Sequence, residues 1–116
     1  MVYITTEVDD NMVIIKVKGE VDASSSINLD NAINEVKSKG YKKIIIDAEE
    51  MNYISSAGLG VFMSYIKDFE KENIALVIFG LDEKVFNVFK MLGLDQLLNI
   101  KSNVEEAKKE LTTRED

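Results

Sequence analysis

Two short runs of continuous apolar residues constrain the fold of this chain more than any other feature. Ile44–Ile46 ends at Asp47, and Ile74–Phe79 ends at Gly80. Runs of this length that are rich in β-branched residues are typical of strands buried on both faces. The segment between them carries apolar residues at helical spacing: Leu59, Phe62, Met63, Ile66 and Phe69. A strand, a helix and a second strand in this order require a parallel crossover connection.

The N-terminal part adds two strands and a helix to this unit. Two β-rich runs, Tyr3–Val8 and Met12–Lys18, flank a polar turn and predict a hairpin. The second run alternates apolar and polar residues, which indicates one buried face. Gly19–Asp22 is expected to form a loop. An amphipathic helix ended by Gly40 follows, with the apolar stripe Leu29, Ala32, Ile33 and Val36.

The C-terminal third predicts two more helices and a short strand near 98–100. The first helix runs from Asp82, an N-cap candidate, to Gly93. Its apolar residues cover more than half of its circumference. Some of Phe86, Phe89 and Met91 could therefore form a patch that binds a partner, but burial in the core is the preferred interpretation. Ser102–Glu105 is a capping-box pattern before the last stripe, Val104, Ala107 and Leu111.

These elements predict an α/β fold with a mixed sheet of four to five strands and four helices. With 116 residues and no linker-like segment, one domain is expected over 1–116, with a frayed charged tail over 110–116. The chain has no cysteine and no histidine, which removes the commonest metal ligands and neutral-pH bases. No cofactor or metal is therefore expected.

The net charge of −7 argues against nucleic acid and anionic membrane as partners. No apolar run approaches the length that spans a bilayer, and no export signal precedes the first strand. The expected location is the cytoplasm.

Two serines, Ser55 and Ser56, stand directly before the second predicted helix. At this position a serine caps the helix, and the unpaired N–H groups there also accommodate a phosphate. Local pattern alone favours the cap. Gly58 and Gly60 are equally explained by close packing of the helix on the sheet.

Enzyme motifs fit this segment poorly. The nucleophile elbow of hydrolases requires glycine two residues before the serine, where Ile54 stands, and a histidine base. Gly58-Leu59-Gly60 lacks both the third glycine of a dinucleotide fingerprint and the lysine of a P-loop. Weak nucleotide binding stays open, and the chain is predicted not to be an enzyme.

The segment Tyr53-Ile54-Ser55-Ser56-Ala57-Gly58-Leu59-Gly60-Val61 resembles the signature of the STAS domain family of anti-sigma factor antagonists. Gly19-Glu20-Val21-Asp22 is similar to a second recurrent feature of that family, and the order of elements matches over nearly the whole chain. The resemblance implies that Ser56 is the phosphoacceptor, with Ser55 as second choice. Ser55 replaces an aspartate of the family pattern, and Ala57 replaces a hydroxyl residue.

The resemblance also implies a surface that binds partners: Glu20, Asp22, Ser55, Ser56 and Gly58. An Asx-turn or a helix cap explains Asp22 equally well, and both readings remain open. The implied function is a switch. The unphosphorylated protein binds an anti-sigma factor that is also a serine kinase, phosphorylation releases it, and a serine phosphatase resets it. The alternative is a non-enzymatic STAS subunit or scaffold of a lipid-transport or stress-signalling assembly.

Overall fold

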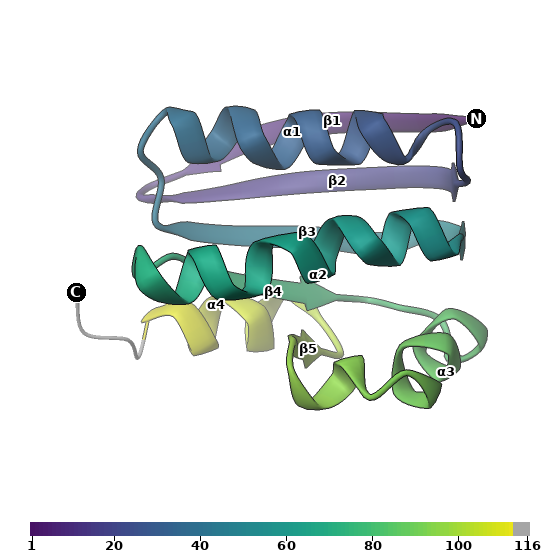
Figure 1. Cartoon of the computed structure of the whole chain (residues 1–116). Coiled ribbons are helices and arrows are strands. Elements are labelled where there is room, and N and C mark those ends of the chain that lie inside the picture. Colours follow the sequence, from purple (N-terminus) through teal and green to yellow (C-terminus); the bar gives the residue numbers. More distant parts are fainter. Residues whose placement is uncertain (113–116) are drawn as a thin grey trace.

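A five-stranded mixed sheet forms the centre of the computed structural model, which describes residues 1–112 (Figure 1). The strands are β1 (Val2–Asp9), β2 (Met12–Val21), β3 (Lys43–Ile54), β4 (Ala75–Phe79) and β5 (Asn99–Lys101). The helices are α1 (Ser26–Ser38), α2 (Ser56–Lys71), α3 (Glu83–Met91) and α4 (Val104–Thr112), with a short 3₁₀ turn, η1 (Leu94–Gln96). The predicted α/β fold with a mixed sheet and four helices is confirmed.

The strands lie in the sheet in the same order as in the chain, β1-β2-β3-β4-β5. β1 and β2 form the predicted antiparallel hairpin, and all later neighbours are parallel. The carboxyl ends of β2, β3, β4 and β5 therefore meet at one edge of the sheet, here called the carboxyl edge. In sheets of this kind, ligands and partners commonly bind at that edge.

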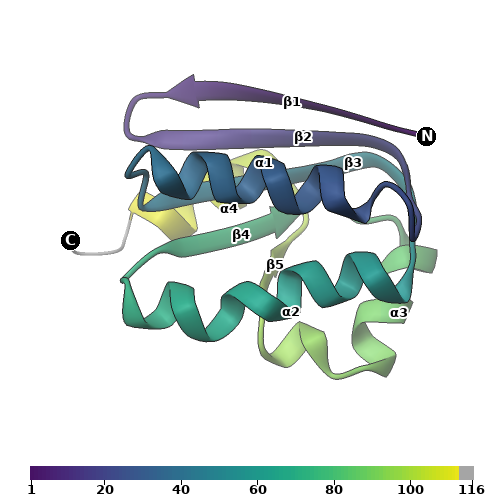
Figure 2. The same ribbon diagram turned by 45° about the horizontal axis from the view of Figure 1, so that its top comes forward.

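Helices cover the two faces of the sheet unequally. α1 and α2 pack side by side on one face, and α4 lies on the other (Figure 2). In the central strand, Ile44 and Ile46 face the core beneath α1 and α2, whereas Ile45 faces the smaller core beneath α4. All three side chains are fully buried, so the prediction of a strand buried on both faces is confirmed.

Two strands are longer than the sequence pattern predicts. β3 does not end at Asp47 but continues to Ile54, and β2 continues through the expected loop to Val21. The two strands stay paired as far as Val21 and Ile54, although register shifts interrupt the pairing after Lys16 and after Gly19. These irregularities break the alternation of apolar and polar residues, so the period-of-two signal is lost while the strands continue.

Several details of the helices also differ from expectation. Met63 of α2 is half exposed, although the apolar stripe to which it belongs was expected to lie in the core. In the third helical segment, Phe89 is buried as preferred, whereas Met91 and Leu92 are exposed. The α4 cap is Asn103, which accepts from the Glu106 N–H; Glu106 in turn accepts from the Ser102 N–H, one residue later than the predicted capping box.

The predicted fraying from residue 110 is wrong for 110–112. α4 continues to Thr112 because Leu111 is fully buried against the sheet. The remainder of the predicted tail, 113–116, lies outside the described residues. Within residues 1–112, no helix has the length and apolar character needed to cross a membrane.

Candidate functional site at the carboxyl edge

Two loops lie side by side at the carboxyl edge, one after β2 and one after β3. Val21 pairs with Ile54 at the last position of the two strands. Immediately beyond it, the Ser55 N–H donates a hydrogen bond of 2.8 Å to the Val21 carbonyl. This bond holds the segment that begins α2 against the segment that leads into α1. The structure therefore brings together the regions of Asp22 and Ser56, which are 34 residues apart in the sequence.

The two serines have different environments. Ser55 is the N-cap of α2, with extended backbone, and its Oγ accepts from the Gly58 N–H at 3.2 Å. Ser56 is the first residue of the helix and is exposed. Its hydroxyl has no hydrogen-bond partner among residues 1–112. The local pattern thus separates into a structural serine at 55 and an accessible hydroxyl at 56.

The first turn of α2 also offers a favourable environment for an anion. The N–H groups of the first turn have no partner within the helix, and Ser55 satisfies the one at Gly58. The positive end of the helix dipole adds to this effect. Negative charge is therefore favoured at the start of α2.

Gly58 allows α2 to approach the sheet closely. A Cβ atom at this position would lie 2.8 Å from side-chain carbons of both Val21 and Ile54. The glycine thus fixes the height of the helix start above the two strand ends, as the packing interpretation predicts. The same interpretation is wrong for Gly60, where a Cβ atom would meet no atom within 4 Å.

Asp22 is held in an Asx-type turn. Its Oδ1 accepts from the Ser25 hydroxyl at 2.8 Å, the Ser25 N–H at 2.8 Å and the Ser24 hydroxyl at 2.9 Å. These bonds, with that from the Ser25 hydroxyl the largest cause, lower the pKa of Asp22 to about 2. The carboxylate is therefore ionised and fixed in direction at neutral pH. The spacing Asp22-Ala23-Ser24-Ser25 is the sequence signal for this turn, and Ser24 and Ser25 are residues that the motif-based prediction missed.

Glu20 lies apart from the other predicted partner-binding residues. Its neighbour Val21 is buried in the core beneath α1 and α2, so the alternation of side chains places Glu20 on the opposite face of the sheet. There it pairs in register with Tyr53, and both side chains are exposed. The structure therefore brings together Asp22, Ser55, Ser56 and Gly58 on the helix side, with Glu20 and Tyr53 behind them.

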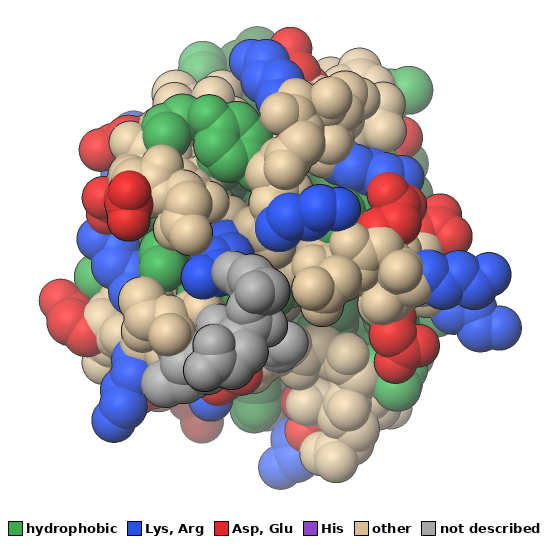
Figure 3. Space-filling model, turned by 90° about the vertical axis from the view of Figure 1, so that its left-hand side faces the viewer, with side chains coloured by type: hydrophobic (Ala, Val, Ile, Leu, Met, Phe, Trp, Pro, Cys, Tyr) green, Lys and Arg blue, Asp and Glu red, His purple; other side chains and the backbone are tan. Residues whose placement is uncertain are grey.

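Several carboxylates lie at the carboxyl edge. Glu20 is near the end of β2, Asp22 directly follows that strand, and Asp82 and Glu83 follow β4 at the start of α3. On the opposite edge, lysines and carboxylates are interspersed (Figure 3). No group of three or more His, Cys, Asp or Glu side chains in residues 1–112 is arranged to hold a metal ion. The site thus combines an exposed hydroxyl with carboxylates, an arrangement that is complementary to positive charge.

The chain is similar to known proteins over most of its length. The model of the STAS domain matches residues 3–107. A curated relative, the anti-sigma-B factor antagonist of Listeria monocytogenes, is 35% identical over 99 residues, which cover 85% of this chain and 86% of the relative.

Solved structures share the fold. An anti-sigma factor antagonist from Mycobacterium paratuberculosis superposes with a TM-score of 0.88 at 19% identity, covering 97% of this chain and 95% of the other. The Bacillus cell fate determinant SpoIIAA in its phosphorylated form superposes with a TM-score of 0.71 at 21% identity, covering 94% of this chain and 99% of that one.

Proposed function

Because the chain belongs to the STAS domain family, we propose that it is an anti-sigma factor antagonist whose partner binding is switched by phosphorylation of Ser56. One observation carries the choice of residue: the Ser55 hydroxyl caps α2, whereas the Ser56 hydroxyl is exposed and unbonded in the described part of the chain. A kinase reaches the second group without breaking the helix start. Ser55 remains the second choice.

The unphosphorylated protein binds an anti-sigma factor and so releases the sigma factor. The same anti-sigma factor acts as an ATP-dependent serine kinase. It transfers the γ-phosphoryl group of ATP to the Ser56 Oγ, the hydroxyl proton passes to a base on the kinase, and ADP leaves. A serine phosphatase hydrolyses the ester to reset the switch. The protein itself supplies no catalytic group, and this partnership places it in the cytoplasm.

The charge of one phosphate is sufficient for the switch. A phosphoserine adds about −1.5 to −2 charges at pH 7. Against one partner carboxylate at ~5 Å, each unit charge costs ~3 kcal/mol at an effective dielectric constant of ~20, before salt screening. Half of this value weakens binding by about tenfold or more. The fold need not change.

Asp22 forms the second part of the proposed partner surface. The hydrogen bonds from Ser24 and Ser25 orient its carboxylate beside the loop of Ser56, where it meets a basic group on the kinase. Asp22→Ala is expected to slow phosphorylation of Ser56 by more than its effect on stability explains. A lower thermal midpoint with a wild-type phosphorylation rate would restrict Asp22 to its structural role.

The switch is tested with the purified anti-sigma partner, by calorimetry at low salt and by mass-spectrometric mapping after incubation with ATP. Ser56→Ala should bind and remain unmodified, and Ser56→Asp should bind more weakly. Ser64→Asp is a matched control, because Ser64 is exposed on the same helix and the charge change is the same. Equal weakening by both aspartates, or most of the phosphate on Ser55, would overturn the proposal.

A further inference from the structure

The outer side of β1 is open along the whole strand. Among residues 1–112, β2 is the only strand beside β1, and Figure 2 shows no element on its outer side. Its eight residues pair with β2 in one regular register. Natural proteins usually protect such a strand with proline, lysine, a bulge or a very short length. β1 has none of these devices. We call its outer side the β1 edge.

The hydrogen-bond pattern shows which backbone groups of β1 point outward. The Glu20 N–H donates to the Met1 carbonyl at 3.2 Å, so Met1 and every second residue after it direct their N–H and C=O groups toward β2. Asp9 and Met12, which flank the two-residue turn of the hairpin, agree with this alternation. The outward groups therefore belong to the even positions of the strand: Val2, Ile4, Thr6 and Val8.

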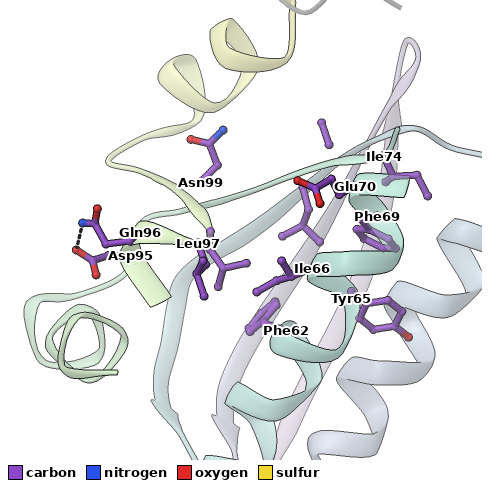
Figure 4. A pocket seen from close by; sticks show the side chains of 13 residues that line it. Phe62, Tyr65, Ile66, Phe69, Glu70, Ile74, Asp95, Gln96, Leu97 and Asn99 are labelled. Carbon is purple, nitrogen blue, oxygen red and sulfur yellow. Dashed lines mark hydrogen bonds between the residues drawn. The ribbon is translucent and has the colours of Figure 1, made fainter. Parts of the chain in front are cut away.

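The sheet offers no comparable strand at its other side. β5 has three residues, which pair with Val77–Phe79 of β4. Ala75 and Leu76, at the start of β4, instead line a cavity of about 540 Å³ between α2 and the η1–β5 segment (Figure 4). Only the β1 edge thus presents a long row of backbone groups within the described part of the chain.

A second copy of β1 satisfies these groups in one extended register. Two copies related by a twofold axis perpendicular to the sheet run antiparallel, and their outward groups meet only where even positions lie opposite even positions. The register that pairs Val2 with Val8 and Ile4 with Thr6 places Thr5 opposite itself. It uses every outward position of both copies. Any other centre leaves Val2 or Val8 without an opposite residue in the strand.

The same register covers an exposed apolar side chain. The even positions of β1 lie on the face toward α1, where Val2 and Ile4 pack against the main core. Val8 lies on that face too, but it is 57% exposed. Val13 of β2 is its neighbour on one side. Val2 of the second copy would lie directly on the other side, so the association buries Val8 and joins the two cores.

The charges of β1 are also compatible with this register. Glu7 lies opposite Tyr3 of the second copy, and Tyr3 pairs with Lys18 of its own β2. The nearest charge across the edge in that row is therefore positive. Asp9 lies beyond the last hydrogen-bonded pair, and Lys108 forms an ion pair with it at 2.7 Å. This arrangement offsets part of the repulsion between two molecules of net charge −7.

We propose that two copies of this chain associate through their β1 edges, in the register centred on Thr5, and join their sheets into one. A contact between identical edges closes after two copies, and the outer strand that remains on each is the short β5. α1 lies between β1 and α2 (Figure 2), so Ser56 is outside the interface. The dimer therefore forms in both states of the proposed switch.

Sedimentation of the full chain at increasing protein concentration tests the association. The wild type should pass from monomer to dimer. Thr6→Pro removes an outward N–H but no bond to β2, so it should fold and dimerise at least about tenfold more weakly. Thr6→Ala keeps that N–H and should stay within about threefold of the wild type. Circular dichroism checks that both variants are folded, and Ser56→Asp, which alters only the switch, should dimerise as the wild type does.

Single cysteines test the register, because the chain has no cysteine of its own. Across the edge, the two Thr5 Cα atoms would lie ~4.5 Å apart, within the range of a disulfide. The two Thr6 positions would be diagonal neighbours ~7–8 Å apart, which is too far. Under mild oxidation, Thr5→Cys should therefore form a covalent dimer at least about tenfold faster than Thr6→Cys.

Three results would overturn the proposal. The first is a wild type that stays monomeric as its concentration rises, which would leave the β1 edge to a strand of another protein. The second is equal dimerisation of folded Thr6→Pro and Thr6→Ala. The third is equal cross-linking of Thr5→Cys and Thr6→Cys. Because none of these measurements involves phosphorylation, a failure of the switch at Ser56 is distinguishable from a failure of this proposal.

Discussion

Ser55 and Ser56 have the same side chain and are neighbours, yet only the first is bonded to the helix that they begin. Ser55→Ala removes the cap of α2 and is expected to lower the free energy of unfolding by about 1 kcal/mol. Ser56→Ala should lower it by less than ~0.5 kcal/mol, because an exposed side chain is removed. Urea unfolding of both variants measures the difference. A larger loss for Ser56→Ala would show that the hydroxyl at 56 has a structural role.

The hydrogen bonds to Asp22 give stability that depends on pH. The pKa of Asp22 is lowered from 3.8 to about 2 in the folded protein, mainly by the Ser25 hydroxyl, so the folded state favours the ionised carboxylate. Its contribution is complete above pH 3.8 and is lost as the pH falls toward 2. The wild type should therefore exceed Asp22→Asn in stability at pH 6, and the two should converge as the pH falls through this range.

Asp68→Asn, which changes an exposed aspartate near the end of α2, is the control for this measurement. Its difference from the wild type should stay nearly constant over the same range of pH. Thermal midpoints recorded across that range compare all three proteins. A constant difference for Asp22→Asn would mean that its hydrogen bonds do not favour the charged form.

At the scale of elements, the position of α2 on the sheet depends on one of its two glycines. Gly58→Ala is expected to destabilise the fold by about 1–3 kcal/mol, because its Cβ atom meets the Val21 and Ile54 side chains at 2.8 Å. Gly60→Ala should stabilise it by about 0.5–1 kcal/mol, because the site is open and helical. Chemical denaturation of the pair gives opposite signs if this packing is correct. The same sign in both would contradict it.

The sequence predicts the type and order of elements better than their ends. Continuous apolar runs locate β3 and β4, because side chains buried on both faces leave a clear pattern. The same criterion misses residues 48–54 of β3. The buried residues there, Ala48, Met51 and Ile54, are spaced by three, which matches neither a continuous apolar run nor the alternation of a half-buried strand. Pairing with β2 and a local irregularity produce that spacing, and both depend on residues far apart in the chain.

The candidate site could be predicted to the segment but not to the atom. The Ser-Ser pair identifies the start of α2, and the side chain that caps it is decided by the backbone at Ser55. The exposure of Glu20 on the other face follows from the extension of β2, which the sequence pattern represented as a loop. The cavity between α2 and the η1–β5 segment has no sequence signal, because it results from the absence of a strand beside Ala75 and Leu76.

At the scale of the whole molecule, the net charge of −7 and the carboxylates at the carboxyl edge should steer a basic partner. The rate of association with the anti-sigma partner is expected to fall about tenfold from low to physiological ionic strength. Stopped-flow measurements should show a smaller salt dependence for Glu20→Gln with Glu83→Gln. Glu7→Gln with Glu105→Gln is the control, because it has the same net charge as that variant but changes residues outside the carboxyl-edge site. Identical slopes for the two variants would show that overall charge alone governs the rate.

The agreement between strand order and chain order has a consequence for synthesis on the ribosome. Each strand pairs with the one made just before it, β1 with β2, then β3, β4 and β5 in turn. During translation, every new strand therefore finds its neighbour already outside the exit tunnel, and no gap in the sheet waits for a later segment. Among the elements of residues 1–112, α4 emerges last, and it closes the second face over Ile45 and Val77. Until it does, the nascent chain displays that apolar face to chaperones and to other nascent chains.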